Sequence, residues 1–505
     1  MNVLHALSLL ATIAFVPLDD RPVSAQLPAL LGRIAGVTVT TPPRTILGNY
    51  LQPGDADGVV DWLTARSNDP TIGAYVVSSD MLAYGGLVAS RVPGPSYAGA
   101  LQRLAVLQTV RHRRPDAWIV AFGTVMRLAP TGVPAGTSYF AAYPEWQALQ
   151  EYANLHDPLL PNEEATAAAL RASLNPATFD AYLATRRRNL DVDRHLIAMR
   201  ASGTLDRLAL GQDDAGPVGL HVAEVKLLQQ EAAAVAASPA PAIEPGADEL
   251  GMALLAGTFA RDARWAPRVQ VRYSRPGGDE FVDPLEFAPI SVAIDGLIAL
   301  CGGQLVDRDP DIVLAVRVPQ TSTAQDDAFA SAMRADIGTG RSVALADLGF
   351  FDSYASQAGF ADRVLTSGLA ARLDAYASWN TNANTVGTAL AESVAAGAGR
   401  RMHTYDSLAH RTFTFMRFVD DYAYHDDVRP QLNAWLDQRG IADHTLLTPA
   451  DAAVVASRNR ALLWNRAAAI LQQLDPGYHI AAIDISLPWR RTFETEVDVG
   501  IAPNL

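Results

Sequence analysis

Short apolar runs alternate with longer amphipathic stretches along the first half of the chain. Short apolar runs bounded by Gly, Pro, Asp or Ser are typical of buried strands. They predict strands at residues 11–17, 37–43, 74–80, 118–127 and 205–214. The intervening stretches have helical periodicity, and a long helical insertion is expected at about residues 136–203. This alternation predicts a parallel α/β fold.

A second set of strand patterns follows a break in composition. Residues 231–245 are rich in Ala and Pro and are interpreted as a linker or a loop between modules. The patterns beyond it predict strands at residues 268–274, 302–307, 311–319 and 341–349. From about residue 385 the pattern is mainly helical. We therefore expect an N-terminal α/β module at 1–235, a second α/β module at 246–390 and a mainly helical region at 391–505.

Two architectures fit these elements. The first has two Rossmann-like modules with parallel sheets plus a helical C-terminal region, and the alternative is a distorted (β/α)8 barrel. The linker and the extra strand at 302–307 favour the two modules. Both architectures place their chemistry at the carboxyl ends of the strands.

Acidic, arginine and amide side chains gather directly after the predicted strands. In the first module they are Asp19, Asp20, Arg21, Asp80, Tyr84, Arg91, Arg127, Asp213 and Asp214. In the second module they are Asp347, Trp379, Asn380 and Asn384. A single acid at a strand end is commonly the N-cap of the next helix. The doublets Asp19-Asp20 and Asp213-Asp214 exceed that need, so we expect one polar ligand site at the strand ends.

Two further motifs carry polar residues suited to this site. The glycine turn "PGADELG" presents Asp248 and Glu249 at the start of a predicted helix. Either acid could instead cap that helix or complement its dipole. The tail "PWRRTFETE" offers polar and aromatic side chains suited to a sugar or an anion: Trp489, Arg490, Arg491 and Glu494.

Composition excludes several classes of function. The net charge of −14 disfavours nucleic-acid binding, which needs a basic face. Cys301 is the only cysteine, so an intrachain disulfide and a thiolate zinc site are excluded. The glycine-rich nucleotide motifs, H-E-x-x-H and G-x-S-x-G do not occur. Nicotinamide, ATP, zincin and α/β-hydrolase functions are therefore not favoured.

The N-terminal sixteen residues are apolar enough to resemble a signal peptide. They lack a basic start and an A-x-A-like cleavage site, and cleavage would damage the first predicted strand. We interpret them as a lead into that strand and expect a cytoplasmic protein, with a signal peptide at 1–16 as the alternative. No other apolar run reaches the roughly 18 residues of a membrane span, so no membrane partner is expected.

The motifs resemble those of a bacterial family catalogued as domain of unknown function 4127. The matching segments include "PLDDRPV", "SSDMLAYGGLVASR", "PGADELG", "YASWNTNANTVGTALA" and "PWRRTFE", in the same order and over nearly the whole chain. The resemblance implies a shared site, and it brings no activity with it.

The residue types favour a glycoside hydrolase acting on a carbohydrate or an amino sugar. Such enzymes place two carboxyl groups about 5 to 9.5 Å apart across the scissile bond. The catalytic candidates are Asp19, Asp20, Asp80, Asp213, Asp214, Asp248 and Glu249. Residues expected to hold the substrate are Arg21, Tyr84, Arg91, Arg127, Asp347, Trp379, Asn380, Asn384, Trp489 and Arg490. Trp379 or Trp489 would stack on a sugar ring.

Two alternatives use the same residues. The aspartate doublets could hold Mg²⁺ or Mn²⁺ for metal-assisted hydrolysis, because these ions prefer oxygen ligands. The glycosidase itself needs no metal or cofactor. In the third hypothesis the two modules hold a small ligand without turnover. The expected partner in each case is a small molecule or an oligosaccharide.

Overall fold

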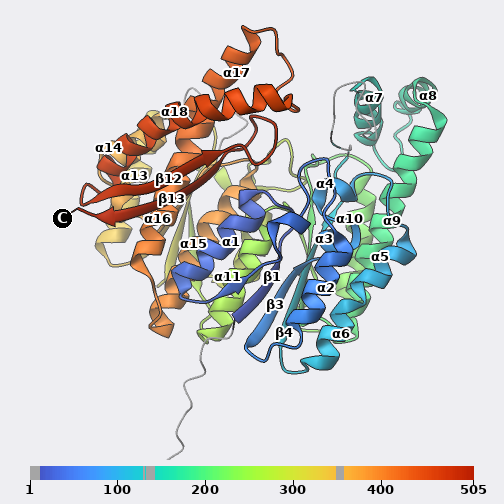
Figure 1. Ribbon diagram of the computed structural model, residues 1–505, viewed down its shortest axis with the longest axis horizontal. Coiled ribbons are helices and arrows are strands. Elements are labelled where there is room, and N and C mark those ends of the chain that lie inside the picture. The colour runs from blue at the N-terminus through green and yellow to red at the C-terminus, as the bar shows by residue number, and fades with distance from the viewer. Residues whose placement is uncertain (1–11, 129–130, 132–142, 349–357, 505) are drawn as a thin grey trace, which may run out of the picture.

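Two separate parallel sheets organise the chain (Figure 1), in agreement with the two-module prediction and not with the barrel. This computed structural model describes residues 12–128, 131, 143–348 and 358–504. The predicted lead into the first strand falls largely on residues 1–11, outside the described part. No helix in that part is long and apolar enough to cross a membrane.

The first sheet has six strands in the order β2-β1-β3-β4-β5-β6. They are β1 (Thr12–Val16), β2 (Val39–Thr40), β3 (Ile72–Ser78), β4 (Trp118–Val125), β5 (Arg207–Gln212) and β6 (Ala242–Pro245). All of them pair in parallel. The prediction of a linker at residues 231–245 is therefore partly wrong, because residues 242–245 form the sixth strand. β6 lies at an edge of the sheet and has too few residues to show a strand pattern in the sequence.

The second sheet has five parallel strands in the order β11-β10-β9-β7-β8. They are β7 (Arg268–Tyr273), β8 (Gln304–Leu305), β9 (Ile312–Arg317), β10 (Ser342–Asp347) and β11 (Ala375–Ala377). Numbered from its own first strand, this sheet has the order 5-4-3-1-2. The first five strands of the first sheet have the same order, 2-1-3-4-5, seen from the other edge. Both sheets are thus doubly wound, with the ligand crevice expected at the carboxyl ends.

Three helices form a layer between the two sheets (Figure 1): α1 (Pro22–Ala35), α11 (Leu250–Asp262) and α15 (Asn382–Met402). Almost every residue of α11 and α15 is buried. Glycines in α15 allow close packing, because a Cβ atom at Gly387 would lie 2.5 Å from Cγ of Glu249. The modules therefore share one apolar core, which includes residues of both sheets.

The other faces of the sheets are covered by further helices. Strand residues alternate between the layers: Phe15 and its neighbour Val76 face the shared core, and Val16 and Val77 face the opposite layer. Around the first sheet lie α2 (Ala56–Arg66), α3 (Ser79–Tyr84), α4 (Leu87–Ser90), α5 (Tyr97–Leu104), α6 (Val106–Arg113), α9 (Pro176–Ala201) and α10 (His221–Ala233). With the second sheet are α12 (Ile290–Leu300), α13 (Thr323–Gly338) and α14 (Ala358–Thr366). The predicted insertion contains α7 (Tyr143–Ala153), α8 (Glu164–Ser173) and α9.

The C-terminal region is mainly helical, as expected, but ends in an antiparallel hairpin. It contains α16 (Ser407–Arg417), the π-helix η5 (Phe418–Val428), α17 (Arg429–Asp437), α18 (Pro449–Leu474), β12 (Tyr478–Ser486) and β13 (Glu496–Pro503). Short 3-10 turns lie at Arg44–Ile46, Gly278–Glu280 and Ala370–Arg372. The loop between β12 and β13 reaches the first module, where Trp489 stacks on Tyr50 with ring centroids 4.7 Å apart. This loop brings the predicted tail motif to the strand ends.

Replacement of Gly397 tests the close packing of α15. A Cβ atom there would lie 2.5 Å from Trp265. That ring is held by a hydrogen bond from its Nε1 to Asp311 and by the Arg401 guanidinium 3.8 Å above it. We expect Gly397→Ala to lower the free energy of unfolding by about 1–3 kcal/mol in urea denaturation. Gly338→Ala is the control, since no atom lies within 4 Å of its Cβ position. Equal effects of the two substitutions would contradict the packing argument.

Candidate functional site

The first strand ends in a turn that leaves two aspartates free of helix capping. β1 ends at Val16 and α1 begins at Pro22, so Arg21 occupies the N-cap position. Arg21 has extended backbone angles and no side-chain capping bond. A proline in the first turn lacks the N–H group that a cap would satisfy. Capping therefore does not account for Asp19 and Asp20.

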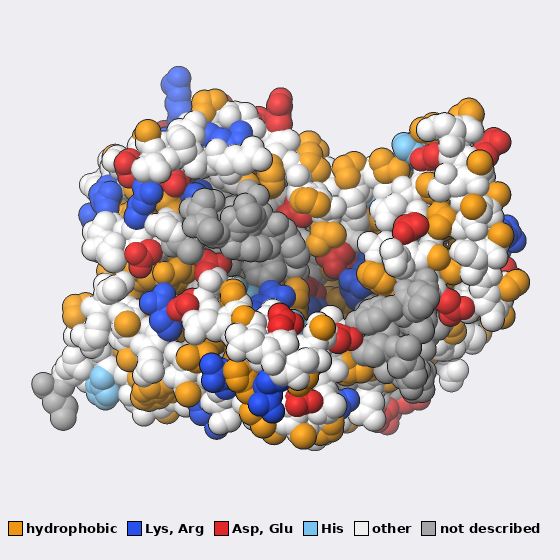
Figure 2. Space-filling view, turned by 90° about the horizontal axis from the view of Figure 1, so that it is seen from above, with side chains coloured by type: hydrophobic (Ala, Val, Ile, Leu, Met, Phe, Trp, Pro, Cys, Tyr) orange, Lys and Arg blue, Asp and Glu red, His pale blue; other side chains and the backbone are white. Residues whose placement is uncertain are grey.

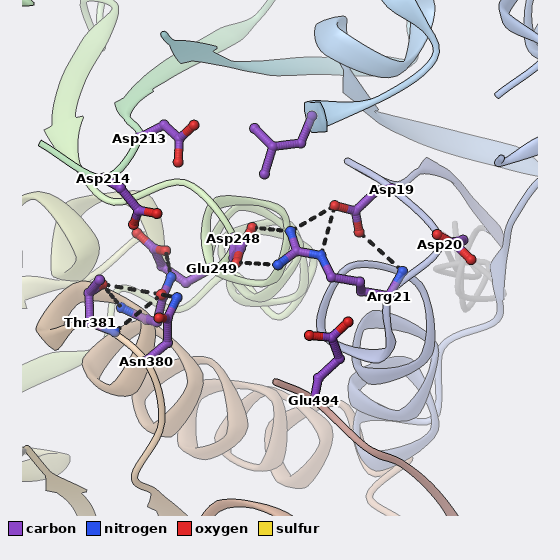
Figure 3. A network of polar contacts seen from close by, with 12 residues as sticks. Asp19, Asp20, Arg21, Asp213, Asp214, Asp248, Glu249, Asn380, Thr381 and Glu494 are labelled. Atoms are coloured by element: carbon purple, nitrogen blue, oxygen red, sulfur yellow. Dashed lines mark hydrogen bonds and ion pairs between the residues drawn. The ribbon is translucent and has the colours of Figure 1, made fainter. Parts of the chain in front are cut away.

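Arg21 joins two loops that are far apart in the sequence (Figure 3). Its Nε and Nη2 donate to Oδ2 of Asp19 at 2.9 and 2.7 Å. Its Nη1 and Nη2 donate to Oδ2 and Oδ1 of Asp248 at 2.9 and 2.6 Å. All three side chains are buried. Forked bonds of this kind fix geometry as well as charge, so the loop after β1 and the loop after β6 are held in one arrangement.

Two further arginines pair with the aspartates that follow β5. Arg91 donates from Nε and Nη2 to Oδ2 of Asp213 at 2.9 and 2.6 Å, and from Nη1 to Thr131 at 3.1 Å. Arg127 donates from Nη1 to Oδ2 of Asp214 at 3.1 Å. The side chain of Asp214 is 29% exposed and that of Asp213 only 5%. Asp214 is therefore the more accessible carboxylate of the doublet.

These residues surround a cavity of about 510 Å³ at the strand ends. Figure 2 shows this face from above, hollowed near its middle, with basic and acidic side chains inside the hollow. The second module and the hairpin loop both contribute to the wall. Its polar and aromatic members are Arg21, Arg91, Arg127, Thr131, Trp146, Gln212, Asp213, Asp214, Asp248, Asn380, Thr381, Asn384, Trp489, Arg491 and Phe493.

Each arginine in the cavity wall has a carboxylate partner. Besides the three pairs above, Arg491 donates from Nε to both carboxylate oxygens of Glu494 at 2.9 and 2.8 Å. The wall is therefore rich in hydrogen-bond donors and acceptors without an excess of positive charge. Such a surface suits an uncharged polar ligand better than a strongly anionic one.

Asp20 is held by the tail motif. Trp489 donates from Nε1 to Oδ1 of Asp20 at 2.7 Å, and Asn49 donates to Oδ2 at 3.1 Å. Burial raises the pKa of Asp20 to about 6. Trp489 is only 2% exposed, since its ring stacks on Tyr50 and the Arg491 guanidinium lies 4.5 Å from it. The indole thus orients Asp20, and little of its ring is open to the sugar that the sequence predicts there.

Two buried glutamates lie behind the cavity wall at the start of α15. Asn384 donates from Nδ2 to Oε2 of Glu249 at 2.5 Å, and the backbone N–H of Ala383 donates to Oε1 of Glu286 at 2.6 Å. The second oxygen of each carboxyl group is buried without a hydrogen-bond partner. Burial raises the pKa of both groups to about 8. Burial therefore favours the protonated form of both glutamates near neutral pH.

Two predicted residues of the first module lie behind the wall instead of on it. Asp80 is buried and accepts a hydrogen bond from Oγ1 of Thr124 at 3.0 Å, and burial raises its pKa to about 7. Tyr84 is also buried and packs under the Arg188 guanidinium, 4.4 Å from its ring centroid. Neither residue is part of the cavity lining.

Three other predicted residues are also outside the cavity. Asp347 ends β10 in the second sheet and accepts a hydrogen bond from Arg317 at 3.3 Å. Trp379 lines a smaller, adjoining pocket. Arg490 is exposed, and the next residue, Arg491, lines the cavity instead. Sequence spacing places these residues in the right loops without showing which way each side chain points.

The structure adds residues that the sequence did not identify as part of the site. Glu286 lies in an irregular loop between the 3-10 turn Gly278–Glu280 and α12 and belongs to no motif. Trp146 comes from α7 in the insertion and lines the cavity half-buried. The only sequence signal for Glu286 is an acid within the otherwise apolar segment "PLEFAP".

The donor set does not match a divalent metal. Across the described ranges, no group of three or more His, Cys, Asp or Glu side chains is arranged to bind an ion. Arg21 and Arg91 bind the oxygens of Asp19, Asp248 and Asp213 that such an ion would need. We therefore derive no step through a metal.

Comparison with known proteins identifies one family. The family model described as "Protein of unknown function (DUF4127)" matches residues 13–498, nearly the whole chain. This match confirms the resemblance drawn from the motifs. No curated protein and no solved structure matches the chain.

Replacement of Arg21 tests its role in joining the two loops. A lysine keeps the charge, but its single ammonium group cannot replace the guanidinium donors that reach both Asp19 and Asp248. Because buried carboxylates would lose their partners, we expect Arg21→Lys to lower the free energy of unfolding by about 3 kcal/mol or more. The exposed Arg490→Lys serves as the control, with an expected change within about 0.5 kcal/mol. Similar small changes in both variants, measured by denaturant unfolding, would show that the fork is dispensable.

The buried Glu249 gives a testable pH dependence. Its pKa is about 8 in the folded protein and about 4.3 in an unfolded chain. Between these values the folded state binds more protons, so stability falls as pH rises through this window. Glu249→Gln removes this contribution to the pH dependence of stability. We expect the stability of this variant relative to the parent to rise by about 2 kcal/mol or more from pH 5 to pH 8.

The exposed Glu280→Gln is the matched control for this measurement, because Glu280 lies at the surface. Its stability relative to the parent should stay constant over the same pH range. A constant difference for Glu249→Gln as well would show that Glu249 is ionised in the folded protein.

Proposed function

We propose that this chain, which belongs to the family described as Protein of unknown function (DUF4127), is a glycoside hydrolase that uses carboxyl groups of the main cavity. The substrate class is a carbohydrate or amino sugar. The observation that carries the proposal is the cavity wall, in which every arginine is paired with a carboxylate. Paired groups offer fixed donors and acceptors to hydroxyl groups without attracting a net charge.

Asp214 and Asp248 are the best placed carboxyl groups for the reaction. Both line the cavity, from the loops after the neighbouring strands β5 and β6. Figure 3 shows them on one side of the network, with Arg21 between Asp248 and Asp19. A glycosidase needs one protonated and one ionised carboxyl group near the scissile bond, and these two residues can divide the roles.

The environment of Asp248 suits the proton donor. Burial raises the pKa of Asp248, and the charge of Asp19 adds to the effect because two carboxyl groups share one guanidinium. A proton on Asp248 removes the excess negative charge of this trio. Its position in the wall would direct the proton at the glycosidic oxygen.

Asp214 suits the nucleophile or the general base. It is the more exposed acid of its doublet, and its Oδ2 accepts a hydrogen bond from Arg127. Asp213 is buried against Arg91 and holds that arginine in place. The half-buried Trp146 and Phe493 supply aromatic surface to the same cavity. A sugar ring could stack on this surface.

The proposal is tested with nitrophenyl glycosides of hexoses and of N-acetylated amino sugars. We expect turnover that a chelator does not change. Asp214→Asn and Asp248→Asn should each lower kcat/KM by about 100-fold or more, while Asp498→Asn, exposed on β13, should leave it unchanged. Loss of activity with the chelator would favour the metal-dependent hydrolase. Tight sugar binding without turnover in the parent protein would identify a binding protein instead.

A further inference from the structure

A second, smaller pocket adjoins the main cavity and shares Arg21, Asn380 and Phe493 with it. Its volume is about 40 Å³. A single water molecule needs roughly 10–15 Å³ by the same measure, so the pocket has room for a group of a few heavy atoms. A ligand in the main cavity could place one substituent here.

One wall of the pocket is apolar. Val23 and Leu27 contribute from α1, and Trp379 contributes from the loop before α15. Trp379 donates from Nε1 to Oγ1 of Thr388 at 3.0 Å, so its polar edge is already satisfied within the protein. This wall suits a methyl or methylene group.

The opposite lining is polar and comes from the end of α16 and the π-helix η5. Arg417 donates from Nη2 to Oδ2 of Asp420 at 2.9 Å and from Nη1 to Oδ1 of Asp421 at 2.7 Å. These bonds fix both lining residues, Arg417 and Asp420. A π-helical turn is rare and occurs frequently at functional sites.

Two atoms of the lining residues Asp420 and Arg417 are buried without hydrogen-bond partners: the acceptor Oδ1 of Asp420 and the donor Nε of Arg417. The nearest imidazole nitrogen, Nε2 of His425, is 4.0 Å from that oxygen, beyond hydrogen-bond reach. Leaving such groups buried without a hydrogen bond destabilises the protein. A ligand that offers one donor and one acceptor would remove this cost.

Resting on the proposed function, we infer that this pocket binds the acetamido group of an N-acetylated sugar whose ring lies in the main cavity. The amide N–H would donate to Asp420, the amide carbonyl would accept from Arg417, and the methyl group would pack on the apolar wall. A free ammonium group fits less well, because the Arg417 guanidinium would repel it and because it has no apolar group to pack on the wall. A hydroxyl group would leave the apolar wall uncovered.

Titration calorimetry on the full chain tests the inference. The probes are the methyl glycosides of N-acetylglucosamine and N-acetylgalactosamine, each compared with the parent glucoside or galactoside. At least one N-acetylated sugar should bind about tenfold more tightly than its parent hexose, and more tightly than the glycoside of the free amino sugar. Equal affinities, or a preference for the free amino sugar, would overturn the inference without any variant.

A variant that fills the pocket gives an independent test. Val23 is only half-buried, so Val23→Phe can extend into the pocket without overpacking the core. It should reduce the affinity ratio of N-acetylated to parent sugar to about one. Val292→Phe, at an exposed position of α12, should keep the ratio of the parent protein. A ratio that survives Val23→Phe would place the acetamido group elsewhere.

The two proposals fail in different ways. If hexosides are hydrolysed in an Asp214-dependent manner without any preference for the acetamido group, only the pocket assignment is wrong. If no sugar binds and none is hydrolysed, the proposed function and the inference both fail.

Discussion

The arrangement of the site depends on one buried cation shared between two carboxylates. Arg21 lies at the start of α1, Asp19 precedes it, and Asp248 precedes α11. A buried guanidinium is tolerated only when its charge and its donors are satisfied. The trio therefore fixes the entry of two helices of the central layer at the same time as it builds the cavity wall. Stability and site geometry rest on the same bonds.

The central layer also explains why the site draws on both modules. α15 begins at the cavity, where Asn384 reaches Glu249, and then continues between the sheets. Its glycines let α11 come so close that Glu249 is enclosed. The hairpin loop completes the wall by holding Asp20 through Trp489. Burial by these distant segments raises the pKa of Asp20 and Glu249.

The sequence predicts the strand ends well, because a buried parallel strand contrasts sharply with the polar turn that follows it. This contrast places Arg21, Arg91 and Asp213 after their strands, and the structure brings all three into one cavity wall. The direction of a side chain within a loop has no such signal: the tail motif offers both Arg490 and Arg491, and only Arg491 lines the cavity. The sequence does not predict β6, because four residues at a sheet edge form no pattern. It does not predict the hairpin either, whose strands lie apart from the parallel sheets and follow a long helix.

The pairing of every arginine in the wall has a kinetic consequence. Fields from paired charges cancel over a few ångströms, and salt screens what remains beyond about 8–10 Å. The cavity therefore exerts little long-range electrostatic attraction on a ligand. The chain as a whole has a net charge of −14. Encounter with a neutral ligand is then governed by diffusion and shape, with little dependence on ionic strength, and anions are repelled before they reach the cavity mouth. Selection against anions thus begins at a distance, before any contact with the site.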